Sequence, residues 1–506
     1  MENQSPQINF WFQTRTIIAI TLALLSLAEI VDLTIVSVAL PNIMGSLSAN
    51  INEISLTITS YIVAAAVLIP LTGFVVNKYG IKKVALTSSL IFAISSILCG
   101  ISTTVTQMIF FRLLQGVGGA FMPSLVQAYV ANNFDGNEQN KMISIVSSTI
   151  VLGPILGPVI GGIITEYLNW RWIFFVNVPI CAIAYLVLSL LMEESKVKEI
   201  KVDFTSFIFM VLGVSFLEYF IDEGNSHNWF DTLNMVIIFA LAIIFIVFFI
   251  WRGLLGKSVV NFKVFKYKET VAMFFSVFLF MLVLNGILVF FPTLLQQGYG
   301  YSPDVAGFIS APRGICAFLS APLVLYLNKK FDPRAVLFLG ISIMILSIWM
   351  LTKLSVVPNL YLIEFICIIQ GFGLISIFIN ISQVTYSNKF TDISHDISGI
   401  FNFFRNIGSS IGTAIAATIL SRQQQVSWHD LASKANIYSP NLQNLMKHFP
   451  TQNLSVKYIY SVFLKQSFFI ANLDVFYYCL ILSFGLLLIP FIIGSVKSSN
   501  QFKIME

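Results

Sequence analysis

The sequence has few charged residues. Only 10% of its 506 residues are Asp, Glu, Lys or Arg, whereas 57% are hydrophobic. The mean hydropathy is +0.84. A chain with so few charged residues cannot cover its surface with hydrated groups as an ordinary water-soluble protein does, so this composition indicates an integral membrane protein.

Residues that build metal and catalytic sites are also scarce. All five cysteines lie within apolar stretches: Cys99, Cys181, Cys316, Cys367 and Cys479. A disulfide framework or a zinc site would need paired thiols in loops, so we expect small buried side chains. His429 and His448 lack the spacing of metal ligands. The chain contains no H-E-x-x-H, no G-x-S-x-G and no phosphate-binding P-loop. We therefore expect no enzyme, no metal site and no cofactor.

Long apolar stretches dominate what is present. A helix of about 20 apolar residues spans a bilayer, and fourteen such stretches begin near residues 16, 54, 84, 107, 142, 172, 204, 233, 270, 304, 335, 359, 394 and 474. The first contains acidic residues and is followed by no small-residue cleavage site, so we expect a retained span and no signal peptide. The sequence predicts an all-α membrane protein with fourteen transmembrane helices.

The basic residues predict the orientation of these helices. With the N-terminus in the cytoplasm, most of the 29 lysines and arginines fall on cytoplasmic segments. Three lie within spans (Arg112, Arg313 and Arg405), and seven lie outside: Arg171, Lys353, Arg422, Lys434, Lys447, Lys457 and Lys465. This asymmetry agrees with the positive-inside rule. We expect both termini in the cytoplasm, and we attribute the net charge of +5 to topology, with no nucleic-acid partner.

A weak internal repeat predicts two halves. V-N-K-Y-G-I-K-K-V-A-L at residues 76–86 is echoed by L-N-K-K-F-D-P-R-A-V-L at 327–337, and the Q-G-V-G that begins at Gln115 is echoed by the Q-G-F-G at Gln370. Parallel repeats of this kind place a substrate site near the midplane between the halves.

The repeat gives the predicted domain boundaries. We expect a six-helix N-terminal half at 1–195, two inserted helices at 196–268 and a six-helix C-terminal half at 269–506. A polar and aromatic loop outside the membrane occupies about 421–472. A loop of this length rarely lacks structure, so we expect some helix there. Two interpretations of its role stay open, a docking surface and a loop without function.

Ionisable residues within spans are costly and indicate function. Glu29 and Asp32 lie three residues apart on one face of the first span. Arg112 in the fourth span comes to a similar depth as Asp32, so the two can form an ion pair. Either acid could couple proton movement to transport, with protons as the coupling ion. The alternative is a buried pair that only fixes helix registry.

Three further charges are candidates for proton coupling or substrate binding. Glu218 and Asp222 form a second acidic face near the outer end of the seventh span, where solvated charges are the favoured interpretation. Arg405 lies near the middle of the thirteenth span. We expect it to pair with Glu364 or with an acid of the first span.

The fifth span contains G-P-I-L-G-P-V-I-G-G at residues 153–162. Gly153, Gly157 and Gly161 fall on one face and allow another helix to approach closely, and Gly162 follows. Pro154 and Pro158 bend the same helix. This pattern predicts a pivot about which two halves rock.

Several strings together resemble one family across nearly the whole chain. They are D-L-T-I-V-S-V-A-L-P from Asp32, Gly73-x-x-x-Asn77-Lys78-x-Gly80-x-Lys82-Lys83, Arg112-x-x-Gln115-Gly116, residues 153–162, W-R-W-I-F-F-V-N-V-P from Trp170, L-L-Q-Q-G-Y-G-Y-S from Leu294, and R-N-I-G-S-S-I-G-T-A from Arg405. They are similar to the fourteen-span drug:proton antiporters of the major facilitator superfamily, the EmrB/QacA-like proteins.

The resemblance implies a multidrug efflux transporter of a bacterial inner membrane, with a role in antibiotic resistance. It implies that the acid of the first span acts in proton coupling or cation recognition, and that Gly73, Asn77, Gly80, Lys82 and Lys83 form a cytoplasmic gate. The usual acid of this gate motif is replaced by Asn77, so its familiar charge relay cannot operate. Relatives also suggest a periplasmic adaptor and an outer-membrane channel as partners. The alternative is a transporter of one siderophore, lipid or metabolite.

Overall fold

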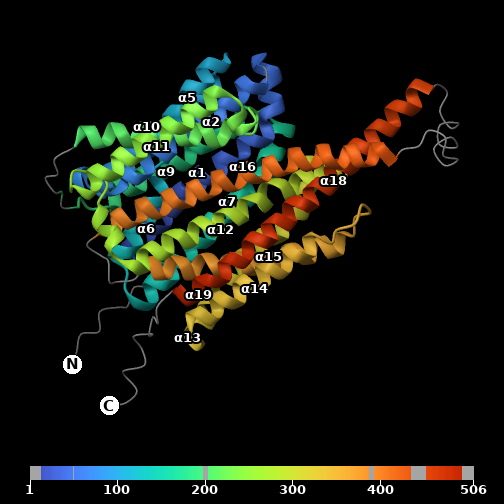
Figure 1. Ribbon diagram of the computed structural model, residues 1–506. Coiled ribbons are helices and arrows are strands. Elements are labelled where there is room, and N and C mark those ends of the chain that lie inside the picture. The colour runs from blue at the N-terminus through green and yellow to red at the C-terminus, as the bar shows by residue number, and fades with distance from the viewer. Residues whose placement is uncertain are drawn as a thin grey trace.

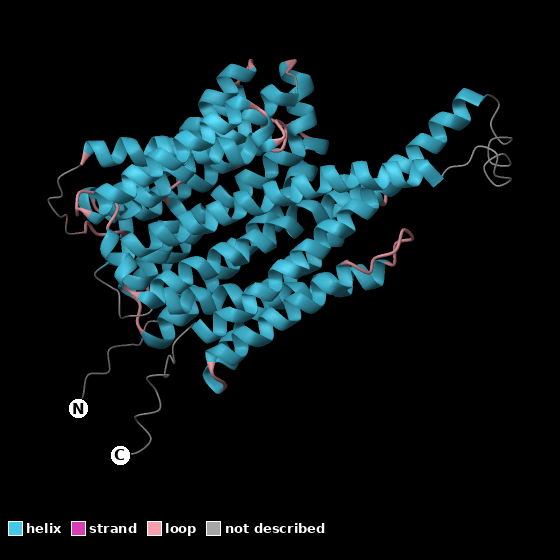
Figure 2. Cartoon of the chain, in the orientation of Figure 1, coloured by secondary structure: helices cyan, strands magenta, loops and turns pink. Residues whose placement is uncertain are grey.

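The computed structural model describes residues 13–49, 51–195, 197, 203–386, 393–434 and 452–492. All regular secondary structure in these ranges is helical (Figure 2). The first helices are α1 (Thr14–Leu47), α2 (Ile51–Leu68), α3 (Thr72–Tyr79), α4 (Ile81–Ile101), α5 (Val105–Gly119), α6 (Met122–Asn133), α7 (Gly136–Tyr167), α8 (Trp172–Phe175) and α9 (Asn177–Leu191). They are followed by α10 (Phe204–Glu223), α11 (Leu233–Leu254), α12 (Lys268–Thr293), α13 (Pro303–Lys330), α14 (Pro333–Leu351), α15 (Leu360–Thr385), α16 (Ser394–Lys434), α18 (Gln452–Phe484) and α19 (Ile489–Ile492).

Twelve helical segments in the described residues are long and apolar enough to cross a membrane. They coincide with twelve of the fourteen predicted stretches, so the prediction of an all-helical membrane protein is confirmed. The stretches predicted near residues 142 and 394 form α7 and α16, which are not among the twelve. α7 packs along α1 and α13, and α16 packs along α12 and α18. Along α16 such contacts replace lipid, and its sequence contains many small and polar residues.

The helices lie side by side in one bundle (Figure 1). α10 and α11, which fall in the inserted segment, form a pair in which α10 contacts both α2 and α16. α7 contacts α13 and α15, while α16 contacts α3 and α6. The early and late helices of the chain are therefore joined at several places.

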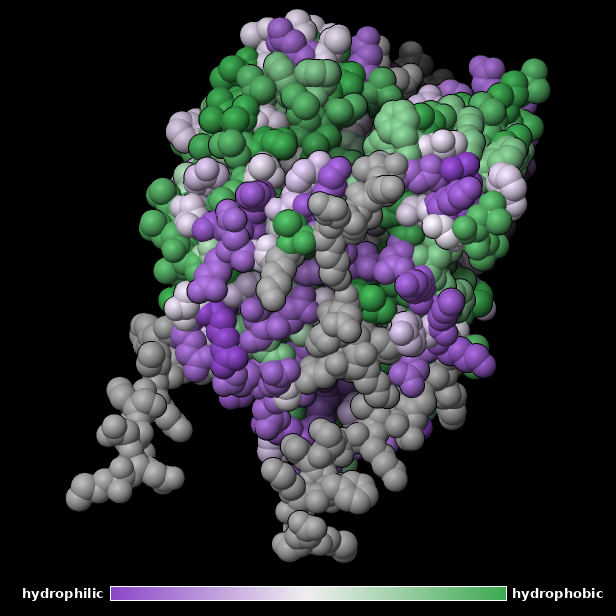
Figure 3. Space-filling view, turned by 90° about the vertical axis from the view of Figure 1, so that its left-hand side faces the viewer, coloured by the Kyte–Doolittle hydropathy of each residue, from purple (hydrophilic) through white to green (hydrophobic). Residues whose placement is uncertain are grey.

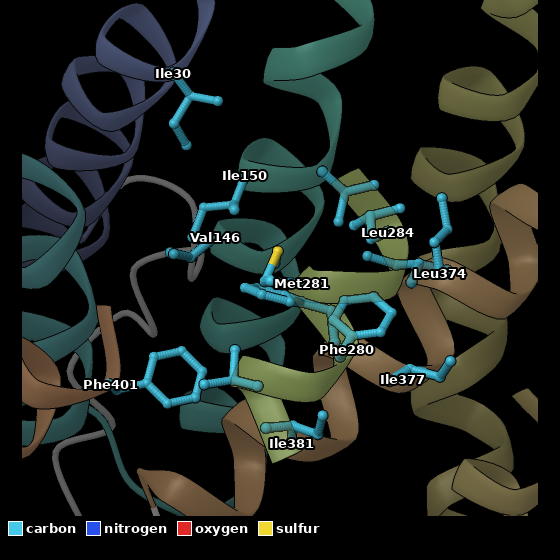
Figure 4. Close-up of a cluster of buried hydrophobic side chains, with 14 of the residues drawn as sticks. Ile30, Val146, Ile150, Phe280, Met281, Leu284, Leu374, Ile377, Ile381 and Phe401 are labelled. Carbon is cyan, nitrogen blue, oxygen red and sulfur yellow. The ribbon is translucent and has the colours of Figure 1, made fainter. Parts of the chain in front are cut away.

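Apolar side chains fill the region between the early and late helices. Ile30 of α1 and Val146 and Ile150 of α7 lie near Met281 and Leu284 of α12, all of them buried (Figure 4). Phe280, Leu374, Ile377, Ile381 and Phe401 extend the same cluster. A second cluster joins α1 to Cys99, Met108, Trp170 and Phe174. The centre of the molecule is thus packed in this conformation.

The outer surface has the distribution expected of a membrane protein. Large apolar side chains are exposed on many helices, among them Leu186, Leu190, Val247 and Leu319. In the end view of Figure 3, hydrophilic residues gather in the middle of the visible face and hydrophobic residues lie to either side. An exposed apolar surface of this extent requires lipid to cover it.

The described part of the predicted outer loop is helical. α16 continues to Lys434 and α18 begins at Gln452, so both helices extend beyond the bundle (Figure 1). Residues 435–451, which include Lys447 and His448, lie outside the described residues, as do both predicted cytoplasmic termini. The last span was predicted to begin near 474, but its helix starts 22 residues earlier, since α18 begins at residue 452.

Candidate functional site

The strongest candidate site is a buried ion pair between α1 and α5. Arg112 Nη1 lies 2.5 Å from Asp32 Oδ2, and both side chains are completely buried. The second carboxylate oxygen of Asp32 accepts hydrogen bonds from Gln115 Nε2 at 3.0 Å and Asn177 Nδ2 at 2.6 Å. A buried charge is tolerated only when it is paired and hydrogen-bonded, and Asp32 meets this condition with three donors.

Further residues fix the orientation of Arg112 and Gln115. Arg112 Nη1 also donates to Gln115 Oε1 at 2.7 Å, and the guanidinium carbon lies 4.3 Å from the centre of the Tyr61 ring. Gln115 Nε2 donates to Ser96 Oγ at 2.9 Å. Five helices, α1, α2, α4, α5 and α9, therefore contribute to one polar cluster. The sequence did not indicate Tyr61 or Ser96, and Asn177 stood unnoticed within the W-R-W-I-F-F-V-N-V-P string.

Glu29 lies one turn from Asp32 but has weaker contacts. Its side chain is buried, and Oε1 accepts a hydrogen bond from the Tyr61 hydroxyl at 3.4 Å. Its Oε2 has no hydrogen-bond partner. The structure therefore separates the two acids that the sequence left equivalent, since Asp32 has three donors and Glu29 has one long one.

Arg405 of α16 has Glu29 as its acidic neighbour. The Glu29 carboxylate is the acidic group close enough to act on the Arg405 guanidinium. In the described part of the chain no carboxylate lies within ion-pair distance of it, and Nη1 has no partner. Glu364, the other expected partner, is exposed on α15. Glu29 and Arg405 thus bring opposite charges together from the early and the late helices.

The expectation of solvated charges at Glu218 is wrong. Glu218 is 1% exposed, and Ser410 of α16 lies beside it. Asp222 is exposed, as expected, and accepts a hydrogen bond from the Thr59 hydroxyl of α2. The packing of α10 against α16 causes this difference, since it covers Glu218 and leaves Asp222 at the rim.

The comparison with known families agrees with this architecture. Residues 22–413 match the sequence profile of the Major Facilitator Superfamily. The chain belongs to this superfamily. It is therefore an integral membrane transporter and not an enzyme.

Similar proteins include several named exporters. The transporter is 30% identical to the multidrug export protein EmrB of Escherichia coli (strain K12) over 431 residues, which cover 84% of each chain. It is 27% identical to the fatty acid resistance protein FarB of Neisseria gonorrhoeae over 469 residues, or 91% of this chain and 92% of FarB. The crystal structure of the human organic anion transporter MFSD10 (TETRAN) has the same fold, with a TM-score of 0.59 at 13% identity, covering 93% of this chain and 99% of that one.

The gate motif of this superfamily member faces an acid from the late helices. A Cβ atom at Gly73 would collide with Asp396 in the first turn of α16, so only glycine allows this approach. Gly80 has a φ of +86° between α3 and α4, a conformation that favours glycine. Asn77 and Lys82 are half-buried and Lys83 is exposed. The carboxylate at this place belongs to Asp396, which also accepts a hydrogen bond from Asn261 Nδ2 at 2.8 Å.

Nearby hydrogen bonds hold the early and late helices of the transporter together. Gln127 Oε1 of α6 accepts from the Tyr386 hydroxyl and from Asn402 Nδ2, each at 2.6 Å. Ser394 Oγ donates to Asn132 Oδ1 at 2.8 Å. These bonds join α6 to α15 and α16 close to the gate motif, so the early and late helices are in direct contact at this end of the bundle.

The glycines of α7 pack against α1. Added Cβ atoms at Gly153, Gly157 and Gly161 would collide with Ile30, Thr34 and Ile35, respectively, whereas one at Gly162 would meet open space. α7 is a single helix through Pro154 and Pro158, whose side chains lie outside the described atoms. On its other side α7 contacts α13. The helix therefore lies between α1 and α13.

Proposed function

We propose that this transporter exports several lipophilic or cationic compounds in exchange for protons, by alternating access. The observation that carries the proposal is the buried Asp32–Arg112 pair with its amide donors. A pair enclosed this completely changes its energy sharply when water, a proton or a cation reaches it from one side. That sensitivity is what couples ion movement to conformational change.

The available energies are sufficient for uphill export. One pH unit across the membrane corresponds to about 1.4 kcal/mol per proton, and moving one charge through 100 mV corresponds to about 2.3 kcal/mol. We assign the coupling proton to Asp32, with Glu29 as the second acid of the path. Arg405 of the C-terminal half and Glu218 of the inserted segment are proposed to respond to their charge.

The proposed motion is a rocking of the N-terminal half (1–195) against the C-terminal half (269–506), with the segment 196–268 contacting both. α7 serves as the pivot because its glycines fix it to α1 while its other side contacts α13. Opening towards the cytoplasm requires the bonds of Gln127 and the Gly73–Asp396 contact to break.

We further propose fourteen spans, with α7 and α16 also crossing the membrane. Glu138 near the start of α7 pairs with Arg15 at the start of α1, whereas Arg171, just past its end, donates to the Ser102 carbonyl at the far end of α4. α16 likewise spans both ends of the bundle. Ser394 at its start donates to Asn132 at the end of α6, and Ser421 donates to Asn225, which lies just past the end of α10. This topology puts both termini in the cytoplasm of a bacterial cell whose inner membrane holds the protein.

The extended pair of α16 and α18 gives the proposal a further element. Since these helices continue beyond the bundle on the side opposite the gate motif, we propose that they contact a periplasmic adaptor that leads to an outer-membrane channel. A second candidate function is export of one lipid-like substrate, which the name of the fatty acid resistance protein FarB favours.

The test is uptake of a fluorescent lipophilic cation into inverted vesicles, driven by a proton gradient. Asp32→Asn is expected to abolish gradient-driven uptake while cation binding persists, and exposed Glu166→Gln serves as the control. Full uptake by Asp32→Asn would show that Asp32 does not carry the coupling proton and would make Glu29 the candidate for that role. No uptake by the unaltered protein, with uptake of a fatty acid instead, would favour the second candidate function.

A further inference from the structure

A second buried arginine, Arg313 of α13, has no acidic partner. It is 1% exposed, and no ion pair in the described part of the chain includes it. Its Nε has no hydrogen-bond partner, and its Nη2 contacts only the Cys367 thiol at 3.9 Å. The guanidinium carbon lies 4.7 Å from the centre of the Phe291 ring. A buried cation held this loosely needs an explanation, because desolvation without pairing is costly.

Gln370 of α15, the helix that packs against α13, provides a second unpartnered group. It is completely buried on α15, one turn after Cys367. Neither its amide nitrogen nor its amide oxygen has a hydrogen-bond partner. α13 and α15 are in direct contact here, since a Cβ at Gly371 would collide with the Arg313 carbonyl oxygen. An unpartnered guanidinium and an unpartnered amide are therefore buried on two helices that touch at this level.

The N-terminal half shows which group completes such a set. There Arg112, Gln115 and Cys99 form the same combination of residue types, with the thiol 3.7 Å from the glutamine oxygen and the guanidinium over an aromatic ring. The Asp32 carboxylate accepts from both the arginine and the glutamine. At Arg313 and Gln370 the arginine, glutamine and thiol are present, and the carboxylate is missing.

We propose that Arg313 and Gln370 bind the carboxylate of an amphipathic cargo molecule. Arg313 would donate charge-assisted hydrogen bonds, the Gln370 amide would donate one more, and Phe291 would contact the apolar carbon next to the carboxylate. The proposal rests on the export function above, and it adds organic acids with an apolar body to the compounds that are carried.

Helix-breaking residues next to the site provide a way in. Pro312 precedes Arg313 inside α13, and Pro292 follows Phe291 inside α12. A π-helical turn at Leu294–Gly298 directly continues α12. Proline removes one backbone hydrogen bond, and π-turns often mark functional sites. Both walls of the site are therefore deformable where a ligand has to pass.

The first test measures binding to the purified full-length protein in detergent. The probes are a dansyl-labelled long-chain fatty acid and its primary amide, which differ only in the charged group. The protein is expected to bind the acid about ten-fold or more tightly than the amide, as a charge-assisted bond provides. Arg313→Gln is expected to remove this preference, Arg313→Lys to keep part of it, and the exposed control Arg422→Gln to keep all of it.

Two results would overturn the proposal at this stage. They are an absent preference in the unaltered protein and an unchanged preference in Arg313→Gln. Titration of the binding reaction with chloride separates the source of the anion. If moderate chloride abolishes the preference, the site holds an inorganic anion and the cargo proposal fails.

The second test is thermal unfolding. Arg313→Gln removes an uncompensated buried charge, so without ligand it should melt at the same temperature as the unaltered protein or higher. The fatty acid should raise the melting temperature of the unaltered protein only. A large loss of stability in Arg313→Gln, with no ligand-induced shift in either protein, would make Arg313 structural. Gln370→Leu, expected to lose a few-fold of the acid preference, keeps the test valid if Arg313→Gln does not fold.

These outcomes are independent of the export proposal. A carboxylate preference without proton-driven cation uptake would support the site at Arg313 and refute the proposed exchange. Cation uptake without a carboxylate preference would do the reverse.

Discussion

Replacing Arg112 alone should lower the free energy of unfolding far more than replacing Arg112 and Asp32 together. In Arg112→Met the Asp32 carboxylate stays buried with only Gln115 and Asn177 as donors. Leaving one member of a buried pair costs about 3–5 kcal/mol. In the double variant Asp32→Asn/Arg112→Met, the new amide can accept from Asn177 and donate to the Gln115 oxygen that Arg112 vacated. We expect most of the lost stability to return.

The measurement is a double-mutant cycle on the free energy of unfolding in mixed micelles. The expected coupling between Asp32 and Arg112 is about 3 kcal/mol, the upper range for residues in direct contact. Arg15 and Glu138 provide a matched control, since they are also an arginine–carboxylate pair but have side chains 40% and 37% exposed. Solvent screens such a pair, so its coupling should stay below about 1 kcal/mol.

One result would refute the reasoning. If the Asp32 and Arg112 substitutions add within about 0.5 kcal/mol, the two groups are energetically independent. The pair would then not be the switch that the proposed exchange requires.

Two further predictions concern the pivot and the gate. Gly157→Ala should lower the free energy of unfolding by about 1–3 kcal/mol, because the added methyl group collides with Thr34 of α1. The control Gly162→Ala adds a methyl group in open space, so the melting temperature should stay unchanged or rise slightly. Equal effects of the two substitutions would contradict close α1–α7 packing. Tyr386→Phe removes a hydrogen bond to Gln127 that is worth about 1 kcal/mol. Ser147 of α7 is buried and lines the same small cavity as Gln127 and Tyr386. The substitution should speed thiol labelling of Ser147→Cys from the cytoplasmic side about five-fold, and unchanged labelling would show that this bond does not hold the gate.

Hydropathy and depth predicted most of the helices and the central pair. Twelve helices follow from apolar length alone, and counting residues from the ends of two spans brought Asp32 level with Arg112. Both inferences depend on the length of each helix and on how far along it a residue lies, and both can be counted directly from the sequence. α7 and α16 were also located correctly as helices.

The remaining parts of the site depend on how helices pack against one another. Asn177 carries no charge, so nothing in its sequence context indicates that it donates to Asp32. Glu218 looked solvent-exposed because its covering surface, α16, lies almost 200 residues away in the sequence. The usual acid of the gate motif is replaced by Asn77, and nothing in the sequence indicated that Asp396 of α16 lies against Gly73. Rotation of each helix about its axis decides these contacts, and periodicity does not give that rotation.

The length of α16 has a mechanical consequence. This single helix of 41 residues contains Asp396 at the gate, Arg405 beside Glu29, Ser410 beside Glu218, and the extension that ends at Lys434. At about 1.5 Å per residue it is a rod of roughly 60 Å. About 44 Å of it lie beyond Arg405, so a tilt of about 10° at that level would displace its outer tip by roughly 8 Å. In the proposed rocking motion, this rigid helix would therefore turn a small movement at the gate into a larger displacement on the far side of the membrane.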